Sequence, residues 1–501
     1  MNHVSELKCL GDMMIKLDID TLKDIETRER IYGNLTSFLE LDEPSNFLDI
    51  LNAIDKSHPR DLESLLGGTK GRRFDFIGGG IIGVTSAYIA GELSRTLGLD
   101  WEIHVWDREK GVGYCSTADS AARTRTSMFG TKKETIGNLA TTLFFENLPR
   151  ILERGYKEVD PGFDFGEIDT DLSRCGYLWL WEKASELEAV KSNQRILHEL
   201  GLPAFILEPS QVKNLLMPRI NAERFNFAYF CPTDAHVGPT DITNAIYRYC
   251  KQVLGINFHF DEEISKISVD TGKPIRFSTV SGSAEQQTYY LGITTGARSG
   301  NLGSLFYVND KHSPLQVPII PKFRQLTYTH GLSKAELEEH TVFSVLMGRG
   351  AYWSKDSLKS DKLIFGYARK EDPEVASSRV HSRMTGSDDY FADNMLIEAR
   401  LDGIHEDISI DSGKLKVFKH RGNLYGETLD GNYLVGLCAP INSANPDGIV
   451  GINAAHNGHG IMSSFSTSLH LIYRLTGIIK EESQLWNPNR TMKPKGETVM
   501  L

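Results

Sequence analysis

A glycine-rich turn between a buried strand and a helix constrains this chain more than any other stretch. The strand-like stretch Phe-Asp-Phe-Ile at residues 74–77 leads into Gly78, Gly80 and Gly83, which have the spacing G-x-G-x-x-G. In such a turn the first glycine permits the tight bend and the second lets a pyrophosphate approach the backbone. The third lets the helix pack closely on the strand. The free N–H groups at the start of the helix then favour phosphate binding.

The sequence after the turn supports a βαβ unit. Residues 84–97 carry small and apolar side chains at helical spacing, and Gly98 ends the pattern. Residues 101–107 predict a second strand that ends in Asp107, 24 positions after Gly83. A carboxylate near this distance typically binds a ribose hydroxyl, so the pattern predicts a dinucleotide site that suits NAD or FAD. The competing interpretation is a structural glycine turn in which Asp107 only caps the next loop.

Composition and charge exclude several classes of function. The 501 residues suffice for about two to four domains. A net charge of −11 argues against non-specific binding to nucleic acid or to an anionic membrane. No apolar run reaches the length of a membrane span, and residues 1–9 lack the apolar core of a signal peptide. The six cysteines are scattered without a C-x-x-C pair, so we expect no zinc site and a cytoplasmic protein with reduced thiols.

Residues 1–71 precede the glycine turn and carry apolar residues at helical spacing. The pattern predicts a helical extension that packs on the main body or forms a dimer contact. A lid over the active site is the alternative. We find no combination of residues in this segment that suggests chemistry.

A run of small residues at 111–122 closes on Arg123 and Arg125. Small residues would let the backbone approach a cofactor, and the two arginines could face that cofactor or an anionic substrate. A surface ion pair is the competing interpretation for each arginine. Further on, residues 291–299 predict a strand that ends in a turn at Gly296.

These motifs, with others in a fixed order, resemble the D-amino-acid oxidase superfamily of FAD-dependent amine oxidoreductases, which includes glycine oxidase, sarcosine oxidase and D-amino-acid dehydrogenases. The resemblance spans about residues 73–477. The ordered motifs are the glycine turn with Asp107, the run to Arg123, Gly176-Tyr177-Leu178, Asp234–Pro239, Thr295-Gly296-Ala297, Pro321–Gln325, Tyr352 with Gly366, Thr428-Leu429-Asp430 and Gly458-His459-Gly460. The set as a whole favours FAD over NAD.

The resemblance implies an α/β protein with a Rossmann-like FAD-binding domain and an interleaved α+β substrate domain built on an antiparallel sheet. The helical extension at residues 1–71 would precede them. The implied FAD domain covers residues 72–130, 220–300 and 415–480, the substrate domain covers 131–219 and 301–414, and residues 481–501 form a C-terminal tail.

The resemblance also implies a set of cofactor contacts. They are Gly78, Gly80, Gly83, Asp107, Arg108, Ser120, Arg123, Gly296, Gly458, His459 and Gly460. The turn at residues 458–460 would begin a helix whose positive end faces the pyrimidine edge of the flavin, where negative charge collects on reduction. A capping or packed histidine is the competing interpretation of His459. We expect FAD to be non-covalent, because the flavin-carrying cysteine of sarcosine oxidases falls on Asn423 and residues 108–130 contain no histidine.

Two departures from the family pattern concern the substrate. The arginine and lysine that bind a substrate carboxylate in sarcosine oxidases fall on Thr126 and Met462. Binding of a short carboxylate in that manner is therefore not expected. Arg125, Arg349 or Lys355 could bind an acid from another direction.

The resemblance implies oxidation of the C–N bond of a small amine or amino acid by hydride transfer to N5 of FAD, followed by hydrolysis of the imine. Our catalytic candidates are Tyr352, as a wall facing the substrate, with Arg125 and Lys355; ordinary sheet core is the competing interpretation of Tyr352. Oxygen or an electron acceptor would reoxidise the flavin. Lys370 lies near the expected position of an oxygen-activating lysine, and the choice between oxidase and dehydrogenase stays open.

Two alternatives stay open as well. One is oxidation of a 2-hydroxy acid or polyol at a C–O bond, which needs a base such as His330, His340 or His381. The other is a flavoprotein with a mainly structural or partner-binding role. The N-terminal helices could then serve a partner, or join copies of this chain in a homo-oligomer.

Overall fold

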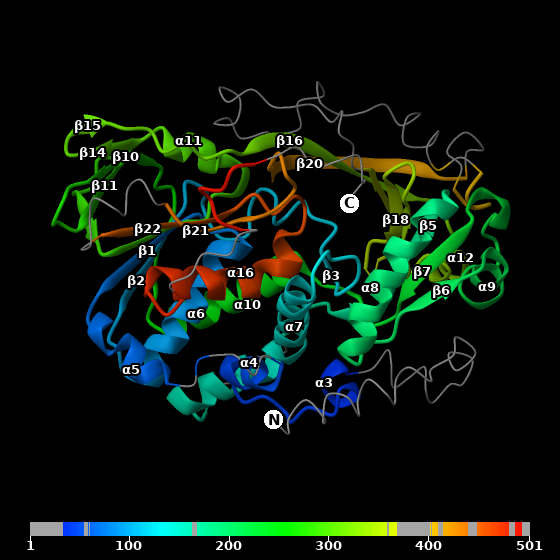
Figure 1. Cartoon of the computed structure of the whole chain (residues 1–501), viewed down its shortest axis with the longest axis horizontal. Coiled ribbons are helices and arrows are strands. Elements are labelled where there is room, and N and C mark those ends of the chain that lie inside the picture. Colours follow the sequence, from blue (N-terminus) through cyan, green and yellow to red (C-terminus); the bar gives the residue numbers. More distant parts are fainter. Residues whose placement is uncertain are drawn as a thin grey trace.

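Two large sheets organise the computed structural model of the chain (Figure 1). The structure describes residues 34–54, 59, 61–162, 168–357, 360–367, 401, 403–408, 414–438, 448–479 and 486–492. The helices predicted within residues 1–33 lie outside the described residues, as do Lys370 and His381.

The first sheet is six-stranded and contains the predicted βαβ unit. Its strand order is β21-β22-β13-β1-β2-β9. The strands are β1 (Arg73–Ile77), β2 (Glu102–Trp106), β9 (Asn257–His259), β13 (Tyr290–Ile293), β21 (Leu434–Leu437) and β22 (Ile449–Ala454). All pairs are parallel except the edge pair β21–β22. Residues 74–77 of β1 are all buried, as expected for a central parallel strand covered on both faces.

Helices cover this sheet, and two of them begin beside its parallel strands. These are α6 (Ile81–Leu97) and α16 (Gly460–Leu475), which pack against each other. Helix α10 (Pro239–Gln252) packs against α6, and α7 (Lys132–Val159) packs against α16. Small side chains permit a close approach, and Ser86 Oγ lies 3.0 Å from Ser468 Oγ. Helix α6 ends before Gly98, as the spacing predicted.

The second sheet is eight-stranded and mostly antiparallel, with the order β20-β16-β19-β18-β17-β5-β7-β6. Its strands are β5 (Tyr177–Trp181), β6 (Phe205–Leu207), β7 (Phe227–Cys231), β16 (Ile320–His330), β17 (Phe343–Leu346), β18 (Ala351–Lys355), β19 (Leu363–Tyr367) and β20 (Lys416–Glu427). The long pair β16–β20 runs across the top of Figure 1 from one sheet region to the other. Together the two sheets confirm the predicted fold class, a parallel α/β unit with an antiparallel-sheet unit.

The chain passes between the two sheets several times. Residues 73–106, 257–293 and 434–454 supply the strands of the six-stranded sheet. The segments between these ranges supply the strands of the eight-stranded sheet. Strands β7 and β20 fall inside ranges that we assigned to the cofactor domain, yet they pair within the eight-stranded sheet. The domain boundaries given above stay a prediction.

Smaller elements complete the described fold. A five-stranded sheet has β10 (Ile264–Val269), β11 (Ile275–Thr279), β12 (Gln286–Thr288), β14 (Phe306–Val308) and β15 (Lys311–His312), and a three-stranded sheet has β3 (Arg123–Thr124), β4 (Ser173–Arg174) and β8 (Ala235–His236). The remaining helices are α3 (Leu35–Phe38), α4 (Phe47–Ile54), α5 (Leu62–Leu66), α8 (Leu187–Glu199), α9 (Pro209–Leu215), α11 (Ser299–Gly303) and α12 (Lys334–Glu338), with short 3-10 turns at Gly67–Thr69, Ala184–Glu186, Ala222–Arg224 and Gly296–Arg298.

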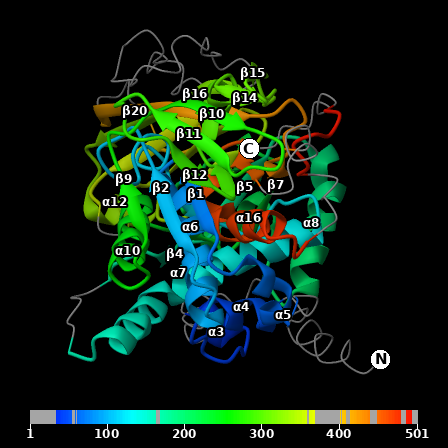
Figure 2. The ribbon, with the colours of Figure 1, turned by 90° about the vertical axis from the view of Figure 1, so that its left-hand side faces the viewer.

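The described part of the N-terminal extension packs on the helical layer of the first sheet (Figure 2). Phe47 of α4 is 1% exposed, and its ring meets those of Tyr88 on α6 and Phe465 on α16 at 6.2 and 5.9 Å. Glu146 of α7 accepts hydrogen bonds from the backbone N–H of Leu35, at the start of α3. These helices therefore belong to the same core as α6 and α16.

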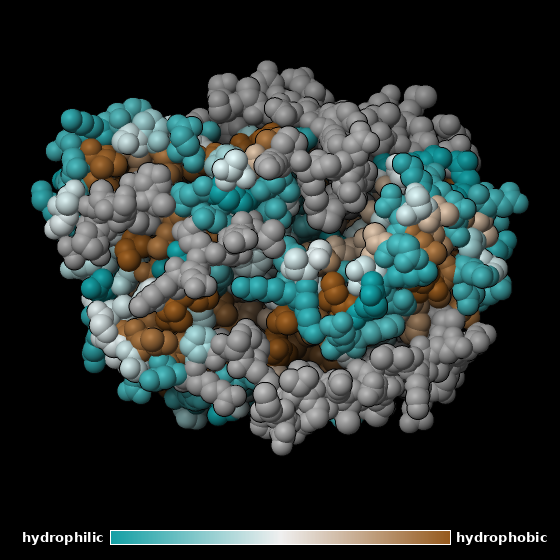
Figure 3. Space-filling model, viewed as in Figure 1, coloured by the Kyte–Doolittle hydropathy of each residue, from teal (hydrophilic) through white to brown (hydrophobic). Residues whose placement is uncertain are grey.

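Hydrophilic residues cover most of the described surface on the face seen in Figure 3, with hydrophobic patches between them. Within the described ranges, no helix combines the length and the apolar composition needed to cross a bilayer. The five cysteines of these ranges are free thiols.

Replacing Phe47 with alanine should destabilise the whole protein, because it empties a site enclosed by α6, α7 and α16. We expect a loss of about 3–5 kcal/mol in the free energy of unfolding, measured by urea titration. The matched control is Leu65→Ala, which removes an apolar side chain that is 51% exposed on α5. The control should change stability by less than about 0.5 kcal/mol. Equal effects of the two variants would contradict this packing.

Three buried histidines should make the fold sensitive to acid. Burial lowers the pKa of His405 and of His456 to about 3, and that of His470 to about 4. In the unfolded chain these histidines have a pKa of about 6.5. Below that pH the unfolded chain therefore binds protons that the folded chain does not bind. Stability should fall as the pH drops from about 6.5 toward about 4, and each such histidine adds up to about 1.4 kcal/mol per pH unit.

The variant His470→Phe isolates one of these contributions. Urea titrations at pH 7, 6 and 5 should give a pH slope that is smaller than that of the unmodified protein by about 1.4 kcal/mol per pH unit. An unchanged slope would show that His470 is protonated in the folded state.

Candidate cofactor and substrate site

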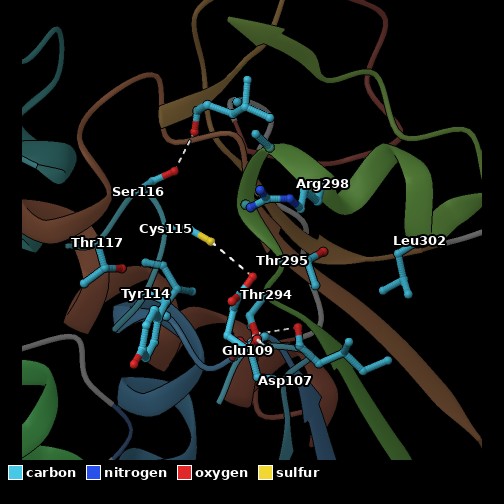
Figure 4. Close-up of a pocket in the computed structure, with 18 of the residues that line it drawn as sticks. Asp107, Glu109, Tyr114, Cys115, Ser116, Thr117, Thr294, Thr295, Arg298 and Leu302 are labelled. Carbon is cyan, nitrogen blue, oxygen red and sulfur yellow. Dashed lines mark hydrogen bonds between the residues drawn. The ribbon is translucent and has the colours of Figure 1, made fainter. Parts of the chain in front are cut away.

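A cavity of about 480 Å³ lies at the carboxyl ends of four parallel strands, where α/β proteins bind nucleotides (Figure 4). The turns after β1, β2, β13 and β22 line it, together with part of β20. The predicted cofactor residues that line it are Gly78, Gly80, Asp107, Arg108, Ser120, Gly296, Gly458 and Gly460. Gly83, Arg123 and His459 are not among the lining residues.

Close backbone contacts explain two of the three glycines in the first turn. A Cβ on Gly83 would lie 1.8 Å from the carbonyl oxygen of Gly78, so only glycine lets α6 begin so near the strand. Gly78 has a φ of +118°, and a Cβ there would lie 2.7 Å from the carbonyl oxygen of Thr294, the residue directly after the neighbouring strand β13. The turn therefore has the compact form that its spacing predicted.

The start of α6 opens on the cavity. Gly80 is the residue before the helix and has no side chain to cap it, so the first-turn N–H groups keep room for another acceptor. The hydroxyl of Thr117 accepts one of these bonds, from the N–H of Ile81 at 3.2 Å. Both Gly80 and Thr117 line the cavity.

Asp107 follows β2 and bonds the backbone of the first glycine turn. Its carboxylate accepts hydrogen bonds from the N–H of Gly79 at 2.5 Å and of Glu109 at 2.7 Å. Burial raises the pKa of this carboxyl group. The side chain thus caps the following loop and also lines the cavity, and a contact with ribose stays a prediction.

The sequence reasoning missed several polar residues of this cavity. Glu109, Cys115, Thr117 and Arg298 all line it, and Figure 4 shows Cys115 and Arg298 pointing toward the same space. Cys115 and Thr117 belong to the run of small residues at 111–122, and Arg298 comes two positions after Gly296. All three therefore lie in or beside motifs that already predicted the cofactor site. Burial raises the pKa of the Cys115 thiol, which keeps it protonated and a poor nucleophile.

His459 stands at the start of α16 but does not cap it with its side chain. Its Nε2 lies 2.9 Å from a terminal nitrogen of Arg125, and because arginine can only donate, Nε2 accepts this bond. Arg125 is 2% exposed and lies over the rings of Tyr177 and Trp179 on β5, at 5.5 and 4.7 Å. Arg125 therefore connects the eight-stranded sheet to the start of α16.

Arg123 lies on the same face of that sheet rather than in the cavity. Its guanidinium is 4.5 Å from the ring centre of Phe343, and it donates hydrogen bonds to Ser354 and His236. His236 in turn lies 3.2 Å from the carboxylate of Asp171. Arg123 is 5% exposed, takes part in none of the ion pairs between described residues, and has its pKa lowered by burial. The structure thus brings it to the predicted substrate wall instead of the cofactor cavity.

Tyr352 shares this face and Lys355 does not. The Tyr352 ring stacks on that of Phe343 at 5.3 Å and fills the space that a side chain at Gly366 would need. Successive residues of a strand point to opposite faces, so Lys355, three positions on, faces away from Tyr352. Its Nζ lies 3.0 Å from the carboxylate of Glu338. The structure therefore brings Tyr352, Arg123 and Arg125 to one face and leaves Lys355 out.

The two positions that depart from the family pattern have structural partners or lie in the core. The N–H and hydroxyl of Thr126 both donate to the buried carboxylate of Asp234, at 2.7 and 3.1 Å, and Ser127 bonds its other oxygen. Met462 is buried in α16. Arg349 also has a partner, because it forms an ion pair with Glu182 at 3.1 Å.

His340, His405 and Asp407 form a buried group whose ligand atoms lie within 4.8 Å of one another. Arg219 bonds both oxygens of Asp407 at 2.8 Å, and Lys414 bonds one of them. Two cations therefore already neutralise the carboxylate that a metal ion would need. We interpret the group as an ion-pair network.

The cavity fits a dinucleotide with a flavin. The glycine turn leaves room for a pyrophosphate, a carboxylate stands at the end of β2, and a second helix start lies at the far end, after β22. The model of the DAO family, described as FAD dependent oxidoreductase, matches residues 77–474, about four-fifths of the chain. The chain therefore belongs to this family of FAD-dependent oxidoreductases.

Solved structures with low identity share the fold. L-proline dehydrogenase from P. horikoshii is 20% identical, with a TM-score of 0.61 over 84% of this chain and 97% of its own. Glycine oxidase from Geobacillus kaustophilus is 17% identical, with a TM-score of 0.61 over 84% and 100%. L-alpha-glycerophosphate oxidase from Mycoplasma pneumoniae, solved with FAD bound, is 13% identical, with a TM-score of 0.58 over 85% and 99%. No protein among the curated sequences matches the chain.

Replacing Gly83 with alanine should weaken FAD binding, because the new methyl group must displace the carbonyl of Gly78. Overpacking of this kind costs about 1–3 kcal/mol, which corresponds to roughly fivefold to 150-fold weaker binding. Titrating the apoprotein with FAD and following flavin fluorescence measures the effect. Gly68→Ala is the matched control, since a Cβ there meets no atom within 4 Å. Equal FAD affinity in both variants would contradict the close contact.

Proposed function

We propose that the protein oxidises the C–N bond of an amine or amino acid. The carbon next to nitrogen would lose a hydride, for which bound FAD would supply the acceptor, the nitrogen would lose a proton, and water would hydrolyse the imine to a carbonyl compound and an amine or ammonia. The observation that carries this proposal is the face shared by Tyr177, Phe343 and Tyr352 with Arg123 and Arg125. Aromatic rings beside a guanidinium suit a substrate with an apolar part and a carboxylate.

The chain's own residues would orient substrate and cofactor. Bound FAD supplies the hydride acceptor. Arg125 bonds His459 at the start of α16, and the positive end of this helix would favour negative charge on a pyrimidine ring bound there. Asn423 donates to the carboxylate of Asp119 at 2.9 Å and offers no nucleophile, which supports a non-covalent cofactor.

Tyr352 would serve as a wall and not as a base. Burial raises its pKa well above the ordinary value, so the phenol keeps its proton at neutral pH. A neutral amine can lose hydride without a strong base, so this proposal needs none. Arg123 is the candidate for the carboxylate end of the substrate, because its buried charge takes part in no ion pair between described residues.

Oxidation at a C–O bond is the competing function, and the glycerophosphate oxidase shows that this fold is compatible with it. That reaction needs a base near the hydroxyl. Of the histidines considered for this role, His330 is exposed at the end of β16 and His340 belongs to the group around Asp407. His236, which bonds Arg123 on the proposed substrate face, is the histidine that such a reaction could use, so the substrate panel below decides between the two reactions.

The test is anaerobic bleaching of the purified protein. It should be yellow and release FAD on heating or acidification, and a D-, L- or N-methyl amino acid should remove its visible absorbance. Ammonia or a primary amine should appear with the carbonyl product. Bleaching by 2-hydroxy acids or polyols alone would favour the competing function, and bleaching by no member of either panel would contradict both.

Replacing Tyr352 with alanine should raise KM for the bleaching substrate at least about tenfold, because the variant loses roughly 1.4 kcal/mol or more of aromatic contact. The matched control is Lys355→Met, on the opposite face of the same strand, which should keep kcat/KM within about twofold. Steady-state kinetics of both variants decides the matter. A greater loss in the lysine variant would restore Lys355 as a site residue.

A further inference from the structure

His456 follows β22 and lines the cofactor cavity with only 8% of its surface exposed. Its ring lies 5.0 Å from that of Tyr433. One ring nitrogen, Nδ1, is 3.1 Å from the hydroxyl of Ser463. The other, Nε2, is buried and has no hydrogen-bond partner in the described part of the chain.

The bonds of Ser463 fix which nitrogen of His456 carries the proton. The Ser463 hydroxyl donates to the carbonyl oxygen of His459 at 2.8 Å, and a carbonyl can only accept. With the single hydroxyl hydrogen used in this bond, we assign the ring hydrogen of His456 to Nδ1, which then donates it to Ser463. Burial lowers the pKa of His456 to about 3, so the ring is neutral and Nε2 is a bare acceptor.

Asn457, the next residue, presents the opposite chemistry. Its side-chain oxygen accepts from the N–H of Thr428 at 3.0 Å, which fixes the orientation of the amide. Its own N–H donates to the carbonyl of Gly426 at 3.1 Å, which holds the backbone in place. The amide nitrogen Nδ2 is buried without a partner in the described ranges, and the residue lines the cavity.

Two adjacent residues of one wall thus offer an unused acceptor and an unused donor. Buried polar atoms in folded proteins are almost always bonded, and an unbonded one costs free energy. A ligand group that carries both a donor and an acceptor would satisfy the two atoms together. This pair lies beside Gly458 and Gly460, at the end of the cavity away from Asp107.

We propose that His456 Nε2 accepts a hydrogen bond from the flavin half of bound FAD and that Asn457 Nδ2 donates one to it. The inference rests on FAD as the cofactor and not on the identity of the substrate. Two parts of that half carry the required chemistry. The pyrimidine ring has N3–H beside carbonyl oxygens, and the ribityl chain has hydroxyls that donate and accept.

The test measures the affinity of the apoprotein for FAD by flavin fluorescence. His456→Phe keeps a ring beside Tyr433 and removes Nε2, and Asn457→Asp keeps the acceptor for Thr428 and removes the donor. Each should raise the Kd for FAD about tenfold or more. His470→Phe is the matched control, because His470 is equally buried in α16 with an unbonded Nε2 but does not line the cavity. It should leave the Kd within about twofold.

Two FAD analogues locate the bond on the cofactor. If His456 accepts from N3–H, an N3-methyl analogue should bind the unmodified protein about tenfold more weakly than FAD and bind His456→Phe with no further loss. If the ribityl chain is the donor, an analogue without ribityl hydroxyls should show that pattern instead. The proposal is overturned if both analogues lose the same factor in the unmodified protein and in His456→Phe.

These measurements need no substrate, so they are separate from the proposed reaction. A failure to oxidise any amine would leave the predicted Kd changes as they are. Unchanged Kd values in His456→Phe and Asn457→Asp would overturn the proposal and leave the reaction untouched. If His456→Phe fails to fold, Asn457→Asp still decides the donor half of the proposal, and the acceptor half is overturned if both analogues bind the unmodified protein as tightly as FAD.

Discussion

The hydrogen bond between Arg125 and His459 connects the eight-stranded sheet to the start of α16, beside the cofactor cavity. A fully buried guanidinium is costly unless its charge is stabilised. Here the aromatic rings of β5 lie against one side of it and the imidazole accepts from the other. Because the start of α16 is held through this contact, the position of the cofactor turn depends on the packing of the eight-stranded sheet. The contact adds to those at the end of β20, where Gly426 and Thr428 bond Asn457 at the cavity.

The first glycine turn was predictable from sequence because all its constraints are local. Gly78 and Gly83 are five residues apart, and the clash that excludes any other residue at position 83 occurs within that span. Strand pairing is different. The pairing of β16 with β20 joins residues about a hundred positions apart, and no local pattern states it. The ranges given to the cofactor domain consequently included β7 and β20, which belong to the other sheet.

The candidate site residues also differ in whether a local sequence signal or a contact between distant residues decides their position. Tyr352 and Lys355 were grouped as catalytic candidates, yet an alternating strand puts residues three apart on opposite faces, so the sequence already contained the signal that separates them. Arg123 offered no such signal, because its direction depends on Phe343, Ser354 and His236, all distant in sequence. The same holds for His456, since its neighbour Ser463 is near in sequence but the use of the hydroxyl hydrogen is decided only by the folded helix.

The N-terminal extension acquires a role from where it packs. Helix α4 inserts Phe47 between α6 and α16, the two helices whose first turns lie at the cofactor cavity. A ligand that binds only the folded protein stabilises it in proportion to the logarithm of its concentration over Kd. FAD and α4 would thus stabilise the same pair of helices. For the described part of the extension, this shared packing indicates a role in stability, while a lid or a partner contact stays a prediction.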